Sequence, residues 1–189
     1  MDVGTGDGAF VCSAARRNPD TLVIGVDANA DNLRDNARKV ARKARRGGLP
    51  NVVFGRTSLD DAPGELHGIA DSLTVLFPWG SLLRAVAMPD HAQLERLRGL
   101  ARPNATVRIV FGYDPTVDAA AVGPLGPIAL LDEARLDTLR ARYREVGIIV
   151  CASRLSAGQV RELPTTWAKR LAFSPKQREF VELRGTVQG

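Results

Sequence analysis

Carboxylates and glycines cluster where the first apolar segments of the chain end, and these residue types can hold a charged ligand. Asp2 lies directly before the glycine-rich stretch Gly4–Gly8, Asp27 ends the next apolar run, and Asp60 follows a third run. Glycines let the backbone turn tightly and approach a ligand closely. The opening sequence DVGTGDG therefore predicts a loop that binds a nucleotide-like cofactor.

The positions of the acids favour S-adenosylmethionine as that cofactor. Asp27 lies 19 residues beyond Gly8, where a carboxylate can accept hydrogen bonds from both ribose hydroxyls. Asp2 would repel the pyrophosphate of a dinucleotide but would attract the ammonium group of S-adenosylmethionine. Asp60 could accept a hydrogen bond from the adenine amino group. NAD stays an alternative, because Gly4, Gly6 and Ala9 fit the loose dinucleotide pattern, and a turn without a ligand is a third.

Each acid also has a purely structural interpretation. Asp27 could cap the helix that follows it, and Asp60, which is next to Asp61, could belong to a solvated acidic loop. Asp7 fits an N-cap of the first helix better than a ligand contact.

The only two tryptophans of the chain occur in two separate loops. Trp79 belongs to the stretch FPWGSLL after an apolar run, and Trp167 belongs to LPTTWAKRL near the C-terminus. A flat base held between two indoles gains about 1–3 kcal/mol from each stacking contact. An enzyme that modifies a base within folded RNA must first extract that base. The two tryptophans therefore predict a base-sized slot, with filling of core gaps as the alternative.

Apolar runs alternate with helical segments, which predicts an α/β fold with a doubly wound, mostly parallel sheet. We expect strands at 22–26, 52–57, 72–77, 106–111, 147–152 and 180–187, and helices at 9–17, 31–45, 91–100, 136–146 and 156–163. The last two strands should form an antiparallel edge pair, and a turn is expected at 102–104. Met1–Val3 supplies only a stub, so we expect a truncated first strand.

Composition indicates one globular domain over residues 1–189. The chain is 44% hydrophobic and 25% charged, with a formal net charge of +5, which is compatible with an RNA partner. No apolar run is long enough to span a membrane, and the histidines and cysteines show no metal-ligand spacing. We therefore expect a cytoplasmic protein with no membrane association and no metal, and we expect a monomer.

Four motifs together carry a family resemblance that runs from residue 2 to about residue 186. They are the glycine-rich stretch DVGTGDG, KARRGGLPNVV at 43–53, FPWGSLL at 77–83 and WAKRLAF at 167–173. The chain resembles the aminoglycoside-resistance methyltransferases that act on N1 of an adenine in the decoding site of 16S rRNA. This resemblance implies a class I (Rossmann-like) methyltransferase fold, S-adenosylmethionine as the methyl donor, and 16S rRNA within the small ribosomal subunit as the partner.

The resemblance also assigns roles to residues. It implies that Trp79 and Trp167 stack the flipped adenine. It implies that the cofactor is held by Asp2, Gly4, Asp27, Ser58, Leu59, Asp60, Leu76, Phe77, Pro78, Ser81 and Thr165. The residues expected to contact RNA are Lys43, Arg45, Arg46, Lys169, Arg170, Lys176 and Arg178. A tRNA guanine-N7 methyltransferase and an RNA-binding protein with impaired catalysis are the alternative functions.

Overall fold

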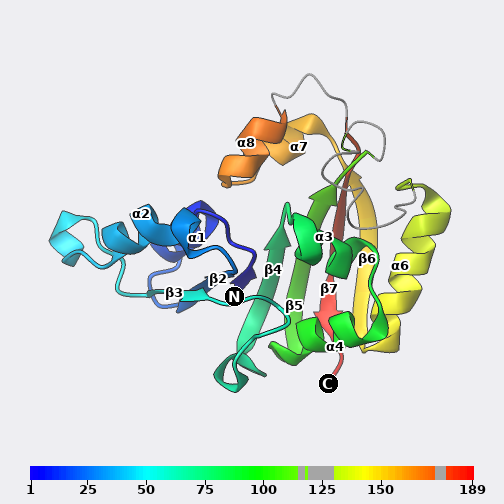
Figure 1. Ribbon diagram of the computed structural model, residues 1–189, viewed down its shortest axis with the longest axis horizontal. Coiled ribbons are helices and arrows are strands. Elements are labelled where there is room, and N and C mark those ends of the chain that lie inside the picture. The colour runs from blue at the N-terminus through cyan, green and yellow to red at the C-terminus, as the bar shows by residue number, and fades with distance from the viewer. Residues whose placement is uncertain (115–117, 119–129, 173–177) are drawn as a thin grey trace.

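The computed structural model of the chain describes residues 1–114, 118, 130–172 and 178–189. Seven strands form one sheet in the order β3-β2-β1-β4-β5-β7-β6 (Figure 1). The strands are β1 (Asp2–Val3), β2 (Val23–Asp27), β3 (Val52–Arg56), β4 (Ala70–Leu76), β5 (Ala101–Gly112), β6 (Ile148–Leu155) and β7 (Phe180–Val187). The helices of eight or more residues are α1 (Ala9–Arg17), α2 (Ala30–Val40), α3 (Gly80–Ala87), α4 (His91–Gly99) and α6 (Glu133–Glu145).

Shorter helical segments complete the described part of the chain. They are the 3-10 turns Ala44–Arg46 and Gly64–Leu66 and the helices α7 (Ala157–Glu162) and α8 (Thr166–Ala172). Within the described ranges, no helix is both long and apolar enough to cross a membrane.

The expected sheet topology is confirmed. β1 pairs in parallel with β2 on one side and with β4 on the other, and β2 with β3 and β4 with β5 are parallel as well. β7 lies between β5 and β6 and is antiparallel to both. Because the carboxyl ends of β1 to β4 meet at one edge, the loops that follow them are gathered in one place.

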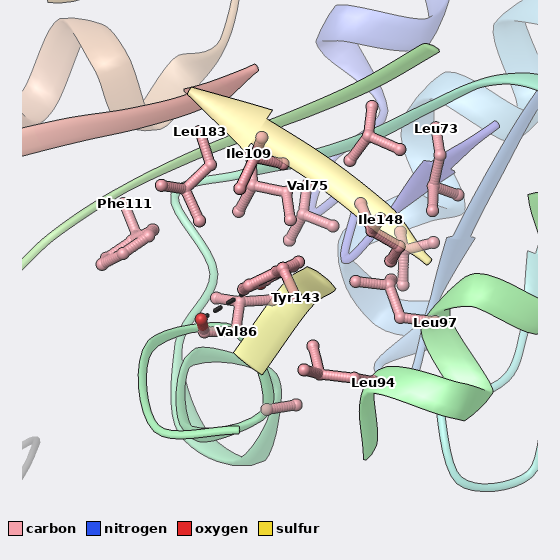
Figure 2. Packing of buried hydrophobic residues seen from close by; sticks show 14 of the residues in the cluster. Leu73, Val75, Val86, Leu94, Leu97, Ile109, Phe111, Tyr143, Ile148 and Leu183 are labelled. Atoms are coloured by element: carbon pink, nitrogen blue, oxygen red, sulfur yellow. Dashed lines mark hydrogen bonds between the residues drawn. The ribbon is translucent and has the colours of Figure 1, made fainter. Parts of the chain in front are cut away.

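The larger part of the hydrophobic core lies on one face of the sheet. Leu73 and Val75 of β4, and Ile109 of β5, point toward the helices α3, α4 and α6 (Figure 2). Tyr143 of α6 is buried there and donates a hydrogen bond from its hydroxyl to the carbonyl of Val86, 3.1 Å away. A smaller cluster on the opposite face joins the sheet to α7 and α8 through Val110, Val160, Leu163, Ala168 and Phe180.

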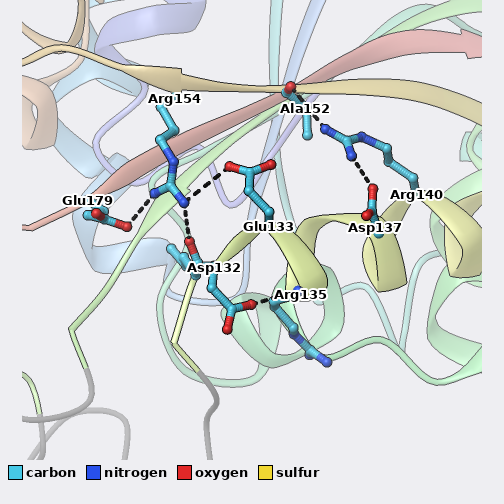
Figure 3. Close-up of polar contacts among 9 residues, drawn as sticks. Asp132, Glu133, Arg135, Asp137, Arg140, Ala152, Arg154 and Glu179 are labelled. Carbon is cyan, nitrogen blue, oxygen red and sulfur yellow. Dashed lines mark hydrogen bonds and ion pairs between the residues drawn. The ribbon is translucent and has the colours of Figure 1, made fainter.

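Ion pairs fasten the outer edge of the sheet to α6. Arg154 of β6 contacts Glu133 at 3.4 Å and also pairs with Glu179, which precedes β7 (Figure 3). Farther along α6, Arg140 pairs with Asp137 of the same helix at 2.5 Å and donates a hydrogen bond to the carbonyl of Ala152 in β6 at 3.4 Å. These side chains are partly or largely exposed, so the contacts fix geometry more than they add stability.

Two expectations about elements are wrong, and two helices were not expected. The basic helix expected at 31–45 ends at Val40 and is followed by a separate 3-10 turn. A Cβ on Gly48 would lie 1.7 Å from the carbonyl oxygen of Arg42, so only glycine allows the chain to fold back there. The turn expected at 102–104 is an irregular segment inside β5, where Ala101 pairs with Ala70 but Thr106 pairs with Ser72. Helices α3 and α8 are not among the expected elements.

Candidate functional site

One pocket of about 310 Å³ opens at the carboxyl ends of β1 to β4 and beneath α8. All eleven residues expected to hold the cofactor line it, and so do Trp79 and Trp167. The pocket therefore brings together segments from residue 2 to residue 167. The role of each residue in ligand binding remains a prediction. The hydrogen bonds that each side chain already makes show which ligand contacts it could still form.

The glycine loop has a shape that side chains would prevent. Gly4, Gly6 and Gly8 all have positive φ angles, of 72°, 59° and 75°. A Cβ on Gly4 would also lie 2.4 Å from Cδ2 of Leu82. The amide of Gly4 donates to the carbonyl of Val26 at 2.8 Å, which fixes the loop to the end of β2. The loop thus leaves its backbone close to the pocket.

Asp27 connects β2 to this loop. Its Oδ2 accepts a hydrogen bond from the amide of Gly6 at 2.8 Å, and its Oδ1 accepts one from the amide of Asn29 at 2.8 Å. The alternative that Asp27 merely caps α2 is wrong, because the side chain of Asn29 accepts the capping bond from Asp31. Asp27 is half-buried at the pocket wall, and its carboxylate has lone pairs left for ligand hydroxyls.

Asp2 is a buried carboxylate at the edge of the same pocket. Its side chain accepts a hydrogen bond from the hydroxyl of Thr74 at 2.6 Å. Burial raises the pKa of Asp2 to about 6, although the bond from Thr74 works in the opposite direction. A buried carboxylate gains from a cationic partner, so the ammonium group of a ligand fits this position.

The loop after β3 forms a further side of the pocket. Leu59 is buried, whereas Ser58 is engaged in a turn, its hydroxyl donating to Asp61 at 2.8 Å. Asp60 is exposed and accepts a hydrogen bond from Nε2 of Gln93 at 2.9 Å, with Arg96 3.3 Å away. Asp60 is therefore tied to α4 rather than simply solvated, and any ligand contact would share its oxygens with Gln93.

The FPWGSLL stretch turns sharply between β4 and α3. Phe77 has a φ of 51°, a left-handed conformation that a phenylalanine rarely adopts, and its amide donates to the carbonyl of Val110 at 2.7 Å. Such strain persists only when the surroundings hold it, and it is common at binding sites. Pro78 is buried, and Trp79 follows at the pocket wall as the N-cap residue of α3.

The two indoles lie against each other. The ring centroids of Trp79 and Trp167 are 5.8 Å apart and the planes are tilted by 46°. A base between two parallel rings needs them about 7 Å apart, twice an optimal carbon–carbon separation. Both predicted walls are thus present, but the slot between them is closed in this conformation.

Hydrogen bonds of the two residues before Trp167 hold the start of α8 in place. Thr165 accepts a hydrogen bond through Oγ1 from the amide of Ala168 at 2.8 Å, so it caps α8. Thr166 donates from its hydroxyl to Oδ2 of Asp7 at 2.5 Å. The other oxygen of Asp7 accepts from the amide of Ala9 at 3.0 Å. The prediction that Asp7 is the N-cap residue of α1 is wrong, because Gly8 occupies that position.

The expected RNA-contacting residues divide into two groups. Lys43, Arg45 and Arg46 are exposed on the 3-10 turn after α2. Lys169 and Arg170 are exposed on α8, and the guanidinium of Arg170 lies 5.6 Å from the ring centre of Trp167. All five side chains are exposed to solvent and are therefore available to contact a polyanion.

Arg178 does not fit the RNA-contacting role in this structure. Its Nε and one terminal nitrogen contact the two carboxylate oxygens of Asp118 at 2.7 and 2.5 Å. The side chains are only 9% and 4% exposed, and the hydrogen bonds with Asp118 raise the pKa of Arg178. The guanidinium is held in a buried ion pair and does not face solvent. Lys176, the other residue of that prediction, lies outside the described residues.

Twelve further residues line the pocket without having been assigned a site role from the sequence, although some of them belong to the glycine-rich and FPWGSLL stretches. They are Val3, Thr5, Gly6, Asp7, Phe10, Ala28, Asn32, Thr57, Leu82, Ala85, Gln93 and Thr166. Thr166 had one usable signal, because it precedes Trp167 directly. Gln93 had none, because it reaches the pocket only through the packing of α4 beside the loop after β3.

Comparisons with known proteins agree with this geometry. The model of the 16S rRNA (adenine(1408)-N(1))-methyltransferase family matches residues 1–186. The chain is 35% identical to the Escherichia coli 16S rRNA (adenine(1408)-N(1))-methyltransferase, over 99% of this chain and 86% of that protein. It is 32% identical to the corresponding protein of Streptoalloteichus hindustanus, with the same coverage.

Solved structures give the same result. The aminoglycoside resistance methyltransferase NpmB1 superimposes with a TM-score of 0.83 at 40% identity, covering 98% of this chain and 85% of that chain. A tryptophan-to-alanine mutant of the enzyme from Catenulisporales acidiphilia, solved with its cosubstrate SAM, gives a TM-score of 0.87 at 30% identity, covering 100% and 84%.

Proposed function

The chain belongs to the 16S rRNA (adenine(1408)-N(1))-methyltransferase family, and on that premise we propose how its own residues perform the reaction. It is an S-adenosylmethionine-dependent enzyme that methylates N1 of an adenine in 16S rRNA, and this modification gives aminoglycoside resistance. The pocket at the carboxyl ends of β1 to β4 is the proposed place of the transfer.

The donor half of the pocket fits S-adenosylmethionine. Asp2 offers a buried negative charge to the ammonium group, and Asp27 offers lone pairs to the ribose hydroxyls. The closely folded Gly4 leaves room where a side chain would collide with Leu82. All of the remaining residues line the pocket: Ser58, Leu59 and Asp60 would border the adenine, and Leu76, Phe77, Pro78, Ser81 and Thr165 would close the remaining sides.

The acceptor half is formed by the two indoles. We assign Trp79 and Trp167 to opposite faces of the flipped adenine, because both line the pocket next to the donor side. Their 5.8 Å separation means that they must move apart before a base can enter. Trp167 is the wall that moves, because it is 40% exposed on a seven-residue helix, whereas Trp79 packs against both hydrophobic clusters.

The chemistry asks mainly for positioning. When bound, S-adenosylmethionine supplies an electrophilic methyl group. N1 of an unpaired adenine has a lone pair and carries no proton, so the protein does not need a general base. The residues around the pocket contribute by holding both reactants in line and excluding water, which is where large rate gains arise.

The partner surface follows from the exposed cations. We propose that Lys43, Arg45, Arg46, Lys169 and Arg170 contact RNA phosphates of the small ribosomal subunit. We propose that the protein acts as a monomer. We propose one catalytic domain over residues 1–189, acting in the cytoplasm, where its ribosomal substrate is found.

The observation that carries these assignments is the convergence of the predicted donor residues and both indoles in one pocket. The test is to incubate the purified protein with small ribosomal subunits and labelled S-adenosylmethionine, and to map the product by reverse transcription. A methyl group on N1 blocks base pairing, so a stop at the target adenine is expected. Transfer to transfer RNA instead, or cofactor binding without any transfer, would favour one of the two alternative functions.

A further inference from the structure

Asp7 joins three elements that surround the pocket. Its Oδ1 accepts a hydrogen bond from the amide of Ala9 at the start of α1, and its Oδ2 accepts one from the hydroxyl of Thr166 in α8. Its backbone carbonyl accepts a third bond from Nδ2 of Asn36 in α2, at 2.6 Å. One residue of the glycine loop therefore contacts the start of α1, the helix that precedes the basic turn, and the helix that carries Trp167.

Helix α8 depends on few anchors among the residues that the structure describes. Ala168 is buried in the smaller hydrophobic cluster, and Thr165 caps the helix from within its own segment. The bond between Thr166 and Asp7 links positions 159 residues apart and connects α8 to the glycine loop. Because Thr166 immediately precedes Trp167, a shift of Asp7 would be passed directly to the indole.

We infer that Asp7 and Thr166 are positioning residues that couple occupation of the donor site to the position of Trp167. This inference rests on the proposed function, because it assumes that Trp167 is a wall of the base slot. Asp7 lies between Gly6 and Gly8, in the loop that a bound donor contacts, and both Asp7 and Thr166 line the pocket. A donor that orders this loop also orders the first turn of α8 and sets the opening between the indoles.

The contact between Asp7 and Thr166 is a directional hydrogen bond and not only van der Waals packing. A hydroxyl that donates to a carboxylate forms one of the shorter and stronger classes of hydrogen bond. Both partners are half-buried, so water competes with the bond less than at an exposed site. The same carboxylate is held in place by the amide of Ala9, so its second oxygen has a defined direction.

The two tryptophans make this coupling measurable. The chain has no other tryptophan, and both line the pocket. Fluorescence excited selectively in tryptophan, and not in the two tyrosines, therefore reports on the slot. We expect that S-adenosylmethionine changes the emission of the wild-type protein, and that Thr166→Val loses at least half of this change. Thr166→Ser, which retains the hydroxyl, is the matched control and should behave as wild type.

Affinity and turnover separate positioning from donor binding. Calorimetry should give Thr166→Val an affinity for S-adenosylmethionine within about twofold of wild type, because the valine removes no proposed donor contact. Its kcat on small ribosomal subunits should fall roughly tenfold, the equivalent of a lost hydrogen bond to a charged group. Wild-type fluorescence response and wild-type kcat in Thr166→Val would overturn the inference.

A second variant makes the test independent of any folding defect. The side chain of Asn has one oxygen acceptor, so Asp7→Asn can keep the bond from the amide of Ala9 but removes the charge that Thr166 contacts. If the two residues act through each other, the variant with both substitutions should be no slower than Thr166→Val alone. Effects that multiply would refute the coupling. Failure of the proposed function is recognised separately, because Trp167→Ala would then retain turnover.

Discussion

Trp79 and Trp167 lie against each other in the pocket, but the chain holds them in different ways. Trp79 follows β4, which is paired on both sides by β1 and β5, and it packs against both hydrophobic clusters. Trp167 is 40% exposed and belongs to α8, a helix of only seven residues at the far end of the sheet from α4 (Figure 1). Trp79 is therefore part of the core, whereas Trp167 lies on a short helix that packs against the core.

This difference in anchoring indicates which of the two indoles moves when the slot between them opens to admit a base. Moving Trp79 would disturb the central strands, whereas moving Trp167 disturbs one short helix and its bond to Asp7. Local openings of this kind occur in segments with few buried apolar contacts. We therefore expect substitutions at the two walls to have different consequences for stability even if both abolish transfer.

Trp79→Ala is expected to have the largest total effect. Removal of a partly buried indole from the junction of two clusters should lower the free energy of unfolding by about 3 kcal/mol, in addition to the loss of base stacking. Denaturant unfolding measures the first effect and methyl transfer to small subunits measures the second. A fully stable Trp79→Ala protein would mean that the two walls are not held differently.

Trp167→Ala should affect transfer alone. Stacking is worth about 1–3 kcal/mol, and the lost alignment adds to this, so turnover should fall about 100-fold. The free energy of unfolding should change by less than about 1 kcal/mol, because the ring is substantially exposed. A large fall in melting temperature would show that Trp167 is core filler and would remove the distinction between the walls.

Asp27→Ala tests the donor half of the pocket, which should not depend on either indole. Loss of charge-assisted hydrogen bonds should weaken S-adenosylmethionine binding by about 1.5–3 kcal/mol. Part of this loss reflects the released amide of Gly6, which Asp27 holds at 2.8 Å. Calorimetry gives the affinity, and Trp167→Ala serves as the control that should bind the donor normally. Unchanged affinity in a folded Asp27→Ala protein would contradict the assignment.

Asp2 predicts a pH dependence of donor binding. Burial raises its pKa from 3.8 to about 6, so it is mostly protonated at pH 5 and mostly ionised at pH 7. If the ionised form binds the ammonium group, affinity should rise about tenfold across this interval. Asp2→Asn should flatten the profile, and a profile that stays steep would exclude Asp2 as its source.

The same shift has the opposite sign for the stability of the ligand-free protein. A carboxyl group with a raised pKa binds its proton more tightly in the folded state than in the unfolded state. Its contribution to stability is therefore complete below about pH 3.8 and is lost as the pH rises through about 6. If Asp2 binds the ammonium group, its burial therefore costs stability in the empty protein at neutral pH, where the ionised carboxylate would bind the donor.

The basic turn after α2 should have the smallest effect. Arg45→Glu combined with Arg46→Glu should weaken binding to small subunits and reduce the slope of log affinity against log salt by about one for each lost phosphate contact. Affinity for S-adenosylmethionine should not change. A salt slope equal to that of wild type would remove this turn from the RNA surface.

Much of the donor half could be predicted from the sequence because it is formed by residues next to strand ends. Apolar runs located β2 to β7 to within a few residues, and glycines marked the loop that follows β1. Parallel pairing then required Asp2 and Asp27 to lie at the same edge. These inferences need only the local pattern and the general topology of such sheets.

The acceptor half was less predictable because it depends on contacts between distant segments. No local pattern indicates that Thr166 reaches Asp7 across 159 positions, or that Arg178 is committed to a buried pair with Asp118. Helix α8 is too short for a clear periodic pattern. The two tryptophans could be interpreted from the sequence as walls of a base slot. Their direct contact, which closes that slot, could not be predicted.

The central claim is that Trp79, which is held in the core, and Trp167, which lies on helix α8, together hold the target base while other pocket residues hold the donor. The most direct measurement is the reverse-transcription stop at the target adenine of small subunits treated with Trp167→Phe or Trp167→Ala, at saturating S-adenosylmethionine and with donor affinity measured on the same samples. Trp167→Phe should retain more of the stop than Trp167→Ala because it keeps a ring face, and both should bind the donor as wild type does. Wild-type stop intensity with Trp167→Ala would contradict the claim.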